Sequence, residues 1–345
     1  MFNPGDQVFG KYRIVKALNP GSFGYVYIVE NYGIGRVSVL KIVLASNPTS
    51  LNELIEAYSQ NLCQHENILK ILASEIVDLG TAVAPSPAIA MELEYVQDGS
   101  LQDRLEQGYM PLKQSVVAIK DILHALEFAH AKNIVHGDVK PSNMFIGTRG
   151  ARLADFGLAK NANLIGAPRA NNTFYVTHGA PELFSGSEID RQTDVYATGI
   201  TLFRAVNNLP DWHTHVISAD PSGAKMQSGD LISEIGYRPE VPTKLRKTIN
   251  RACARDRSKR YQSCAEFRKA LESLYFSSEW KRISPTEWIS DVPGRNERLT
   301  LKTGVRHAIE YKMNGRKKQA NCATFNSMKE AEEHLYSFLK QNTIE

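Results

Sequence analysis

The chain of 345 residues lacks most of the features that mark secreted, membrane or fibrous proteins. Its four cysteines stand far apart with no Cys-x-x-Cys pair, which excludes a zinc knuckle and argues against a disulfide framework. The longest apolar stretch, around residues 82–91, is flanked by acidic residues, so no transmembrane span is predicted. The N-terminus has neither the basic nor the apolar region of a signal peptide. These absences predict a cytoplasmic protein with no membrane contact.

The composition that remains is that of an ordinary globular protein, with 42% hydrophobic and 23% charged residues. A length of 345 residues exceeds what one core usually needs, so we expect more than one domain. The net charge is +4, and residues 277–345 hold 12 Lys and Arg against 9 Asp and Glu. Most of the positive excess therefore lies in the last fifth of the chain, where a solvated face is its simplest explanation.

Hydrophobic periodicity divides the chain into three parts. Residues 1–96 predict an amphipathic helix at 51–62 and strands at 12–17, 26–30, 36–43, 68–77 and 88–96. Residues 97–276 predict helices at 111–132, 192–207, 243–255 and 263–274. Residues 277–345 form a third, slightly basic unit. Between the first two helices, residues 133–187 are rich in loop formers, and such loops on a rigid scaffold are where we expect the chemistry.

Two features of the first part could contact phosphate. Residues 19–24 read Asn-Pro-Gly-Ser-Phe-Gly between two predicted strands, and glycines there let backbone N–H groups approach phosphate oxygens. A plain hairpin turn is the commoner explanation. A Rossmann site is disfavoured because a strand follows, where that site needs a helix. Lys41 lies near the end of the next strand and alone would be a solvated charge.

The most specific motif is the stretch at 134–143, Ile-Val-His-Gly-Asp-Val-Lys-Pro-Ser-Asn. Asp138 could accept the proton of a hydroxyl, Lys140 could steady a transferred phosphoryl group and Asn143 could ligate a metal. Asp155, in the Ala-Asp-Phe-Gly stretch at 154–157, supplies a second metal-binding side chain. Phosphoryl transfer needs this set, because it depends on positioning and on neutralising charge rather than on covalent chemistry.

In their order, these motifs resemble those of the eukaryotic-like serine/threonine protein kinases over residues 12–274. Ala-Pro-Glu at 180–182, Asp-Val-Tyr-Ala-Thr-Gly at 194–199 and Asp-Arg-Ser-Lys-Arg-Tyr at 256–261 extend the match. The resemblance implies an α+β, bilobal kinase fold with a β-rich N-lobe (1–96) and a helical C-lobe (97–276), followed by a small α+β domain. It also implies transfer of the γ-phosphoryl group of ATP, with Mg²⁺, to Ser or Thr of protein substrates and of the chain itself. The divergent motifs suggest a bacterial origin.

The resemblance assigns a role to each matching residue. Asp138 is the catalytic base, Lys140 contacts the transferred phosphate, and Asn143 and Asp155 are the Mg²⁺ ligands. Lys41 binds the ATP phosphates and pairs with Glu56, or with Glu53 one turn earlier. The residues that surround ATP are Asn19, Gly21, Ser22, Gly24, Val26, Val39, Lys41, Leu93, Glu94, Val96 and Ser100. Among these, Leu93 is the gatekeeper, and Glu94 and Val96 belong to the hinge. Glu182 is expected to pair with Arg260, and Asp194 to anchor the catalytic loop.

Four departures from the family's pattern put regulation and substrate choice in doubt. The first loop glycine is Asn19. Gly137 replaces the arginine before the catalytic base, which removes the usual partner of a phosphorylated activation loop. The threonine that normally bonds the catalytic aspartate and lysine is missing or is displaced to Thr177. Gln60 occupies a helix position that is usually apolar.

Residues 277–345 predict a β-β-β-α unit with strands at 298–302, 306–312 and 317–325, after an irregular stretch at 280–289. Ser327 begins a capping box for the final helix, and Asn314-Gly315 predicts a two-residue hairpin turn. The basic side chains near this turn are Lys312, Arg316, Lys317 and Lys318. The unit is distantly similar to the arm-type DNA-binding modules of integrases. An accessory domain that packs on the kinase or recruits a protein is favoured over nucleic-acid contact.

Two other functions are compatible with parts of the pattern. A small-molecule kinase of the aminoglycoside or choline type also carries His-Gly-Asp in its catalytic loop, but residues 180–182, Arg260 and Lys140 favour a peptide substrate. A pseudokinase scaffold that acts through the C-terminal domain would usually have lost the lysine, the base or a metal ligand. All of these are present, so an active protein kinase is the favoured hypothesis.

Overall fold

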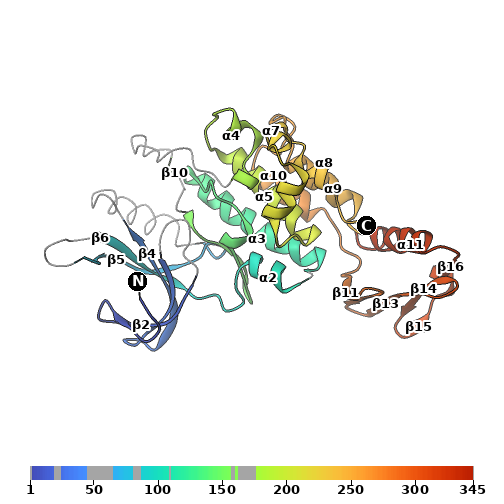
Figure 1. Ribbon diagram of the computed structural model, residues 1–345, viewed down its shortest axis with the longest axis horizontal. Helices are drawn as coiled ribbons and strands as arrows, with labels where there is room; N and C mark the ends of the chain where they lie inside the picture. The colour runs from blue at the N-terminus through green and yellow to red at the C-terminus, as the bar shows by residue number, and fades with distance from the viewer. Residues whose placement is uncertain are drawn as a thin grey trace.

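The structure is a computed structural model that describes residues 2–18, 25–44, 65–80, 87–108, 110–156, 160–161 and 176–344. Figure 1 shows a sheet near the N-terminus, a group of helices at the centre, and a second sheet with one long helix near the C-terminus. We call these parts the N-terminal lobe (residues 2–94), the helical lobe (101–272) and the C-terminal domain (277–344). Within the described residues, no helix combines the length and the apolar character needed to cross a bilayer.

The N-terminal lobe is a six-stranded antiparallel sheet, and five of its strands match those predicted, whereas the two-residue strand β1 was not predicted. In sheet order its strands are β1 (Gln7–Val8), β2 (Tyr12–Ala17), β3 (Tyr25–Asn31), β4 (Arg36–Leu44), β6 (Pro87–Glu94) and β5 (Ile71–Asp78). Alternate residues face a buried core that includes Ile14, Val29, Leu40 and Ile42. The helix predicted at 51–62 lies outside the described residues.

A buried glutamate is part of this core face. Glu92 is 3% exposed, and its Oε2 accepts hydrogen bonds from the Tyr12 hydroxyl at 3.0 Å and from Asn31 Nδ2 at 3.2 Å. Arg36 Nη2 donates to the other oxygen at 3.1 Å. A buried carboxylate is tolerated only when it is paired and hydrogen-bonded in this way. The network joins side chains of β2, β3 and β4 to β6.

Two long helices form the centre of the helical lobe. They are α3 (Leu112–Ala131) and α5 (Arg191–Asn207), which confirm the helices predicted at 111–132 and 192–207. Residues 193–207 of α5 are all buried, and Asp190 caps the helix by accepting from the N–H groups of Gln192 and Thr193. The other helices are α2 (Leu101–Gln107), α4 (Pro181–Phe184), α6 (Trp212–Ala219), α7 (Ala224–Ser228), α8 (Leu231–Ile235), α9 (Thr243–Ala252) and α10 (Cys264–Glu272).

Short elements occupy the stretch that the sequence predicts as loop-rich. They are β7 (Ile134–Val135), the 3₁₀ turn η1 (Pro141–Asn143), β8 (Met144–Gly147), β9 (Gly150–Leu153), β10 (Lys160–Asn161) and the 3₁₀ turn η3 (Val176–His178). The hairpin of β8 and β9 pairs Met144 with Leu153 at one end and Gly147 with Gly150 at its turn. Since Asn143 precedes β8 and Asp155 follows β9 closely, the hairpin brings these two residues to the same end.

The C-terminal domain contains more strands than the sequence predicts. Its elements are β11 (Lys281–Ser284), β12 (Glu287–Val292), β13 (Arg295–Lys302), β14 (His307–Met313), β15 (Arg316–Lys317), the 3₁₀ turn η4 (Gln319–Asn321), β16 (Ala323–Phe325) and α11 (Met328–Gln341). The expectation of an irregular stretch at 280–289 is wrong, because Trp280 and Trp288 anchor β11 and β12 in a core of their own. The single strand expected at 317–325 is also wrong. η4 divides it into β15 and β16, which both pair with β14.

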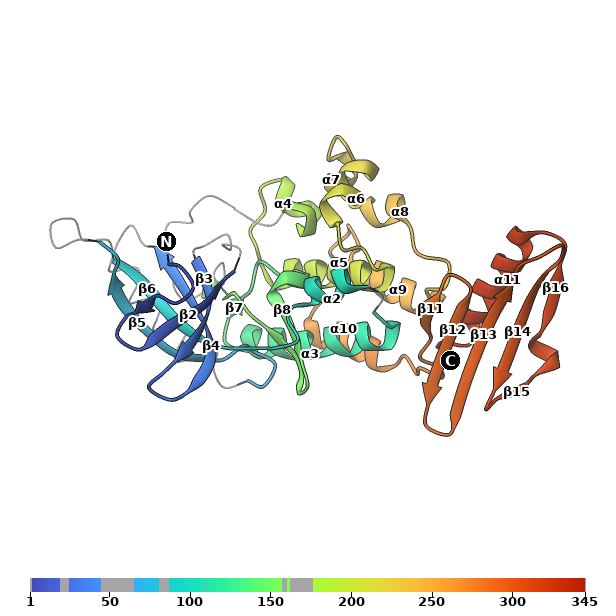
Figure 2. The same ribbon diagram turned by 60° about the horizontal axis from the view of Figure 1, so that its bottom comes forward.

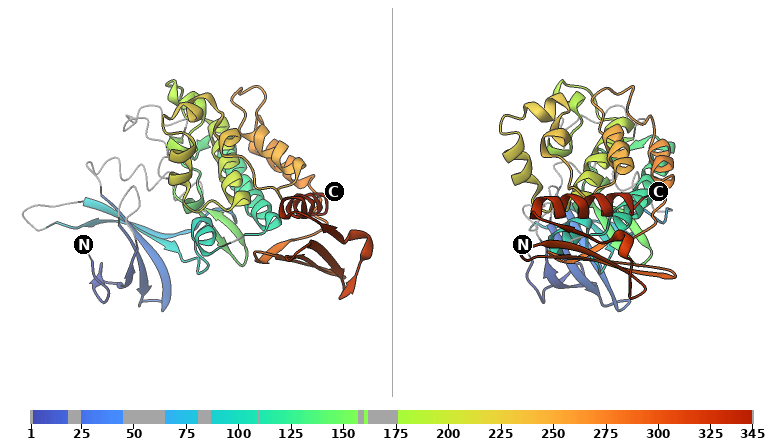
Figure 3. Two further views of the ribbon diagram at one scale, coloured as in Figure 1. Left: turned by 45° about the vertical axis from the view of Figure 1, so that its right-hand side comes forward. Right: turned by 90° about the vertical axis from the view of Figure 1, so that its right-hand side faces the viewer.

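Helix α11 covers one face of the C-terminal sheet (Figure 3). Ser327 caps the helix as predicted, with its Oγ accepting from the N–H of Glu330 at 3.2 Å. Ala331, Leu335 and Leu339 recur at helical spacing and are at most 1% exposed, so they bury the inner face of the helix against the sheet. The domain therefore has a hydrophobic core separate from that of the helical lobe.

The C-terminal domain packs on the helical lobe on the side away from the N-terminal sheet (Figure 2). Phe276 and Ile344 form an isolated β-bridge, and the N–H of Ser277 donates to the carbonyl of Thr343 at 3.0 Å. Ile344 is buried within the core of the helical lobe, and Lys113 of α3 forms an ion pair with Glu279. The structure thus agrees with the expectation that this domain packs on the rest of the chain.

The basic side chains predicted near the 314–315 turn are partly neutralised. Lys302, Lys312 and Lys317 lie 2.9, 3.1 and 3.6 Å from the carboxylate of Glu310. Hydrogen bonds from Lys302 and Lys312 lower the pKa of Glu310 to about 2, so its carboxylate is ionised at neutral pH. Arg316 and Lys318 remain exposed. Nucleic-acid contact through this turn stays a prediction.

Candidate active site

Four of the predicted ATP-binding side chains lie on one face of the N-terminal sheet. Val26 of β3 pairs directly with Lys41 of β4, and Val39 of β4 pairs with Leu93 of β6. Directly paired residues point to the same side of a sheet, and so do residues two apart on one strand. These four side chains therefore share the face opposite to the buried core.

This face meets the helical lobe at a small apolar cluster. Leu69, Val96 and Ala154 are buried together, and Leu93 and Phe145 pack against them. The gatekeeper and the hinge predicted from the sequence therefore lie against β8 and the segment that carries the predicted metal ligands. Phe145 had no role in the sequence analysis. Its position two residues after Asn143, at the start of a strand, is the signal that could have placed it in this cluster.

The two remaining hinge-side residues use their side chains to hold the backbone. The carboxylate of Glu94 lies 3.4 Å from Arg152 Nε and accepts from the N–H of Lys70 at 2.9 Å. Ser100 caps α2, and its hydroxyl donates to the Asp103 carboxylate at 2.7 Å. Their assignment to ATP stays a prediction. The predicted residues Asn19, Gly21, Ser22, Gly24, Glu53, Glu56 and Gln60 lie outside the described residues.

The catalytic loop brings three predicted residues into contact. Lys140 Nζ lies 2.7 Å from Asp138 Oδ2, and Asn143 Nδ2 donates to the same oxygen at 3.1 Å and to the Asp138 carbonyl at 2.8 Å. The side chain of Asp138 is only 4% exposed. Such a carboxylate, held by a cation and an amide, has its position fixed before any substrate arrives.

Asp194 at the start of α5 anchors this loop, as the sequence predicts. Its carboxylate accepts from the N–H groups of His136 at 2.9 Å and Gly137 at 2.8 Å, and contacts His130 Nε2 at 2.8 Å. Gly137 has φ of 76°, in the left-handed region. An arginine would be strained there, so the replacement noted in the sequence matches the local backbone.

His136 connects the catalytic loop to the segment of Asp155. Its Nδ1 accepts from the N–H of Asp138 at 3.1 Å, so its Nε2 carries the proton and donates to the Ala154 carbonyl at 2.9 Å. Phe156 is buried, with its ring 4.5 Å from that of His136. The N–H of Ala154 also donates to the Asn143 carbonyl at 2.8 Å. His136 belongs to the motif at 134–143, but no role was predicted for it from the sequence.

Lys41 and Asp155 meet across the two lobes. Lys41 Nζ lies 2.6 Å from Asp155 Oδ1, and the side chains are 12% and 25% exposed. Asp155 has φ of 63°, a conformation that non-glycine residues seldom adopt and that is concentrated at functional sites. The ion pair holds the predicted phosphate-binding lysine beside the predicted metal ligand.

The residues at this point fit a magnesium ion. Asn143 uses its amide nitrogen for Asp138, so its side-chain oxygen is the atom that can ligate a metal. Asp155 adds a carboxylate, and Mg²⁺ prefers such oxygen ligands together with substrate phosphates. The hairpin of β8 and β9 and the hydrogen bond from the N–H of Ala154 to the carbonyl of Asn143 keep Asn143 and the segment of Asp155 together.

Part of the activation segment departs from the expectation. The Thr177 hydroxyl is buried and has no hydrogen-bond partner in the structure as described, so the bond expected from it to Asp138 or Lys140 is not formed. The Thr177 carbonyl instead accepts from Trp212 Nε1 at 3.1 Å. The reason is geometric, because η3 turns this carbonyl toward α6 and buries the hydroxyl.

His178, next along the chain, is 3% exposed and was not singled out from the sequence. Its Nε2 lies 3.5 Å from Arg204 Nη1, and its ring packs edge-on against Trp212. Burial, followed by the charges of Arg204 and Lys140, lowers the pKa of His178 well below its ordinary value. The imidazole is therefore neutral at physiological pH.

The pairing of Glu182 with Arg260 is confirmed. Arg260 Nη1 and Nη2 lie 2.7 and 3.0 Å from the two carboxylate oxygens of Glu182, in a bidentate geometry. The Arg260 side chain is fully buried and also donates to the carbonyls of Ala254 and Gln192. The bridge joins α4 to the segment before α10 and fixes the end of the activation segment.

A sheet lobe joined to a helical lobe, with Lys41, Asp138, Asn143 and Asp155 between them, is the arrangement of a protein kinase domain. The family model of the protein kinase domain matches residues 12–276, and the chain belongs to this family.

The chain is similar to several bacterial serine/threonine-protein kinases. Pkn1 of Myxococcus xanthus is 29% identical over 283 residues, which cover 76% of this chain and 38% of the relative. PrkC of Bacillus subtilis is 26% identical over 279 residues, covering 79% and 41%. The chain thus spans about two fifths of the length of these relatives. The PknI kinase domain of Mycobacterium tuberculosis has a TM-score of 0.55 at 22% identity, covering 79% of this chain and 98% of the solved one, and it supports the kinase fold.

Proposed function

We propose that the chain is an ATP- and Mg²⁺-dependent kinase that transfers the γ-phosphoryl group to Ser and Thr hydroxyls of cytoplasmic proteins and of itself. The names of its relatives support the Ser/Thr class. The observation that carries the proposal is the contact of Asp138 with Lys140 and Asn143. A hydrogen bond from the N–H of Ala154 to the carbonyl of Asn143 joins this cluster to the segment of Asp155.

Each side chain of this cluster has a defined task in the proposed reaction. Asp138 accepts the proton of the substrate hydroxyl, and the neighbouring Lys140 ammonium stabilises the negative charge that develops on the phosphoryl group. Asn143 and Asp155 would hold Mg²⁺, which neutralises phosphate charge when bound. Lys41 contacts the ATP phosphates once the nucleotide separates it from Asp155. Val26, Val39, Leu93 and Phe145 exclude water around the adenine.

Incubation with Mg²⁺ and γ-labelled ATP, followed by acid hydrolysis, tests the proposal. Label on phosphoserine and phosphothreonine of the chain or of an added protein mixture is the expected result. Label on phosphotyrosine alone would reject the Ser/Thr class. Transfer to an aminoglycoside or to choline, with no label on protein, would favour the small-molecule alternative.

The pseudokinase alternative predicts ATP binding without transfer. The contacts of Lys41 with Asp155 and of Lys140 with Asp138 weigh against it, because a scaffold needs no positioned base. For the C-terminal domain we keep the proposal of a protein-recruiting accessory unit, since three lysines of its basic surface already surround Glu310.

A further inference from the structure

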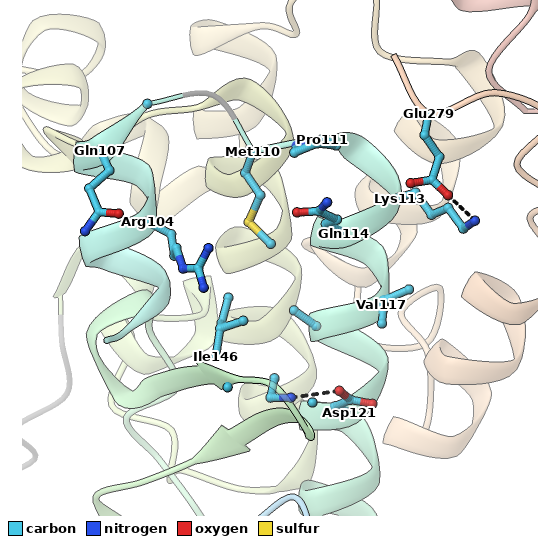
Figure 4. Close-up of a pocket in the computed structure, with 15 residues that line it drawn as sticks. Arg104, Gln107, Met110, Pro111, Lys113, Gln114, Val117, Asp121, Ile146 and Glu279 are labelled. Carbon is cyan, nitrogen blue, oxygen red and sulfur yellow. Dashed lines mark hydrogen bonds and ion pairs between the residues drawn. The ribbon is translucent and has the colours of Figure 1, made fainter. Parts of the chain in front are cut away.

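A hollow of about 480 Å³ lies on the helical lobe between α2, α3 and the turn of β8 and β9 (Figure 4). This volume is within the range of ligand-binding pockets. Met110, Val117 and Ile146 supply its apolar wall, and Val117 is 44% exposed although it is a valine on a long helix. No residue that we assign to ATP, metal or proton transfer lines the hollow.

The two ends of the hollow carry opposite charges. At one end, Asp121 Oδ2 accepts from the N–H of Ala151 at 2.8 Å, and burial raises the pKa of this carboxyl group. A partly desolvated carboxylate gains most from a cation placed beside it. At the other end, Figure 4 shows the Arg104 guanidinium pointing toward Ile146.

Arg104 retains hydrogen-bonding capacity. Its side chain is 39% exposed, and Asp98, with its Oδ2 3.4 Å from Arg104 Nη2, is its one ion-pair partner among the described residues. A carbonyl or carboxylate oxygen of an occupant would complete the hydrogen bonding of this guanidinium. The charge pattern of the hollow therefore matches an occupant with a basic side chain toward Asp121 and an oxygen acceptor toward Arg104.

The hollow is connected to the active site by the hairpin of β8 and β9. Gly147 and Gly150 line the hollow and pair with each other at the turn, while Met144 pairs with Leu153 at the catalytic end. Three residue steps along a strand span about 10 Å. An occupant of the hollow would thus sit near the active site without competing for it. The ion pair of Lys113 with Glu279 places the rim of the hollow at the junction with the C-terminal domain.

We propose that this hollow is a docking site for an extended segment of a protein substrate, with a basic side chain at Asp121 and an apolar side chain on the wall of Met110, Val117 and Ile146. The choice of a protein segment rests on the proposed function, since a protein kinase acts on long chains that can contact it at two places. An extended segment also supplies backbone carbonyls for Arg104 along the open hollow. Docking raises the effective concentration of the phosphoacceptor, so it lowers KM and leaves kcat unchanged.

A binding assay without ATP tests the site separately from catalysis. The probes are fluorescein-labelled decapeptides of Gly and Ala that carry one Arg and one Leu, separated by one to five residues, and contain no Ser, Thr or Tyr. We expect at least one spacing to saturate the full chain in fluorescence anisotropy. Asp121→Asn and Val117→Asp should each weaken binding at least tenfold, and so should replacing the Arg of the peptide by Glu.

Matched controls separate docking from general effects. Asp291→Asn and Val305→Asp make the same changes at exposed positions of the C-terminal domain and should leave binding unchanged. Thermal melts show whether each variant is folded. Asn at 121 can still accept from Ala151, so that variant preserves the hairpin contact even if Val117→Asp disturbs packing.

Three results would overturn the proposal. They are the absence of binding at every spacing, binding that survives both variants, and tighter binding of the Glu peptides. Sedimentation of the chain alone decides between docking and self-association: a dimer that dissociates in Val117→Asp would assign the hollow to a second copy instead. Because the binding assay uses no ATP, a negative result would reject the docking site and would not count against the proposed kinase activity. Conversely, if the chain binds these peptides but transfers no phosphoryl group, the proposed activity is rejected and the docking site stands.

Discussion

Removal of the Glu182 carboxylate should destabilise the helical lobe strongly. In Glu182→Ala, the Arg260 guanidinium keeps the carbonyls of Ala254 and Gln192 but loses its only bidentate partner among the described residues. The Arg260 side chain is 0% exposed, so solvent cannot replace the lost carboxylate without opening the lobe. Breaking such a buried pair costs about 3–5 kcal/mol.

The expected size can be checked by thermal melts. A destabilisation of 1 kcal/mol lowers Tm by about 2–4 °C in a unit of this size, so Glu182→Ala should melt about 6–20 °C below the wild type. Glu234→Ala is the matched control. It removes a carboxylate that pairs with Lys225 at 3.1 Å, but both side chains are more than 40% exposed and solvent screens the pair. The control should melt close to the wild type.

A double-mutant cycle isolates the pair itself. Arg260→Met removes the charge and retains an apolar side chain of similar length, so the double variant no longer contains a buried charge. We expect its destabilisation to be at least 2 kcal/mol smaller than the sum for the two single variants, within the range of about 0.5–3 kcal/mol measured for residues in contact. Additive single effects, or a Glu182→Ala melt equal to that of Glu234→Ala, would refute the reasoning.

Three further predictions concern the catalytic loop, a buried histidine and the docked C-terminal end. Asp194→Asn should lower kcat about 100-fold in a folded protein, because an amide NH₂ would face the loop N–H groups and displace Asp138; a wild-type kcat would contradict this. His178 stays neutral when folded but gains a proton when unfolded, so stability should fall by up to about 1.4 kcal/mol per pH unit below about pH 6.5. His178→Gln should flatten this slope in urea titrations at pH 5 to 7, and parallel slopes would argue against it. Ile344→Ala should destabilise the helical lobe by about 2–5 kcal/mol, whereas Val305→Ala, at a fully exposed position, should not; equal melts would reject the docking of the C-terminal end.

The contacts predicted best are those that the resemblance to the protein kinases implies. The pairing of Glu182 with Arg260 and the anchoring of the catalytic loop by Asp194 were both expected on that ground, although the first pair is 78 residues apart. The strands of the N-terminal lobe followed equally well, because their alternation of buried and exposed residues is regular.

Other features depend on tertiary packing that single-sequence patterns do not carry. The contact of Lys41 with Asp155 joins residues 114 apart, and no local signal indicates it. The burial of His178 results from Arg204 of α5 and Trp212 of α6. In the C-terminal domain, β11 and β12 were missed because few of their residues are apolar, and only the packing of Trp280 and Trp288 in one core with α11 reveals this region as part of a sheet.

Self-labelling of Asp155→Asn with Mg²⁺ and γ-labelled ATP tests the central claim most directly. Asparagine tolerates the left-handed φ of this position, so the fold should persist and the melt should be unchanged. Because one carboxylate is lost from the predicted metal site, we expect the labelling rate to fall about 100- to 1,000-fold, while Asp291→Asn labels as the wild type does. Labelling of Asp155→Asn within a few-fold of the wild type would contradict the assignment of the active site.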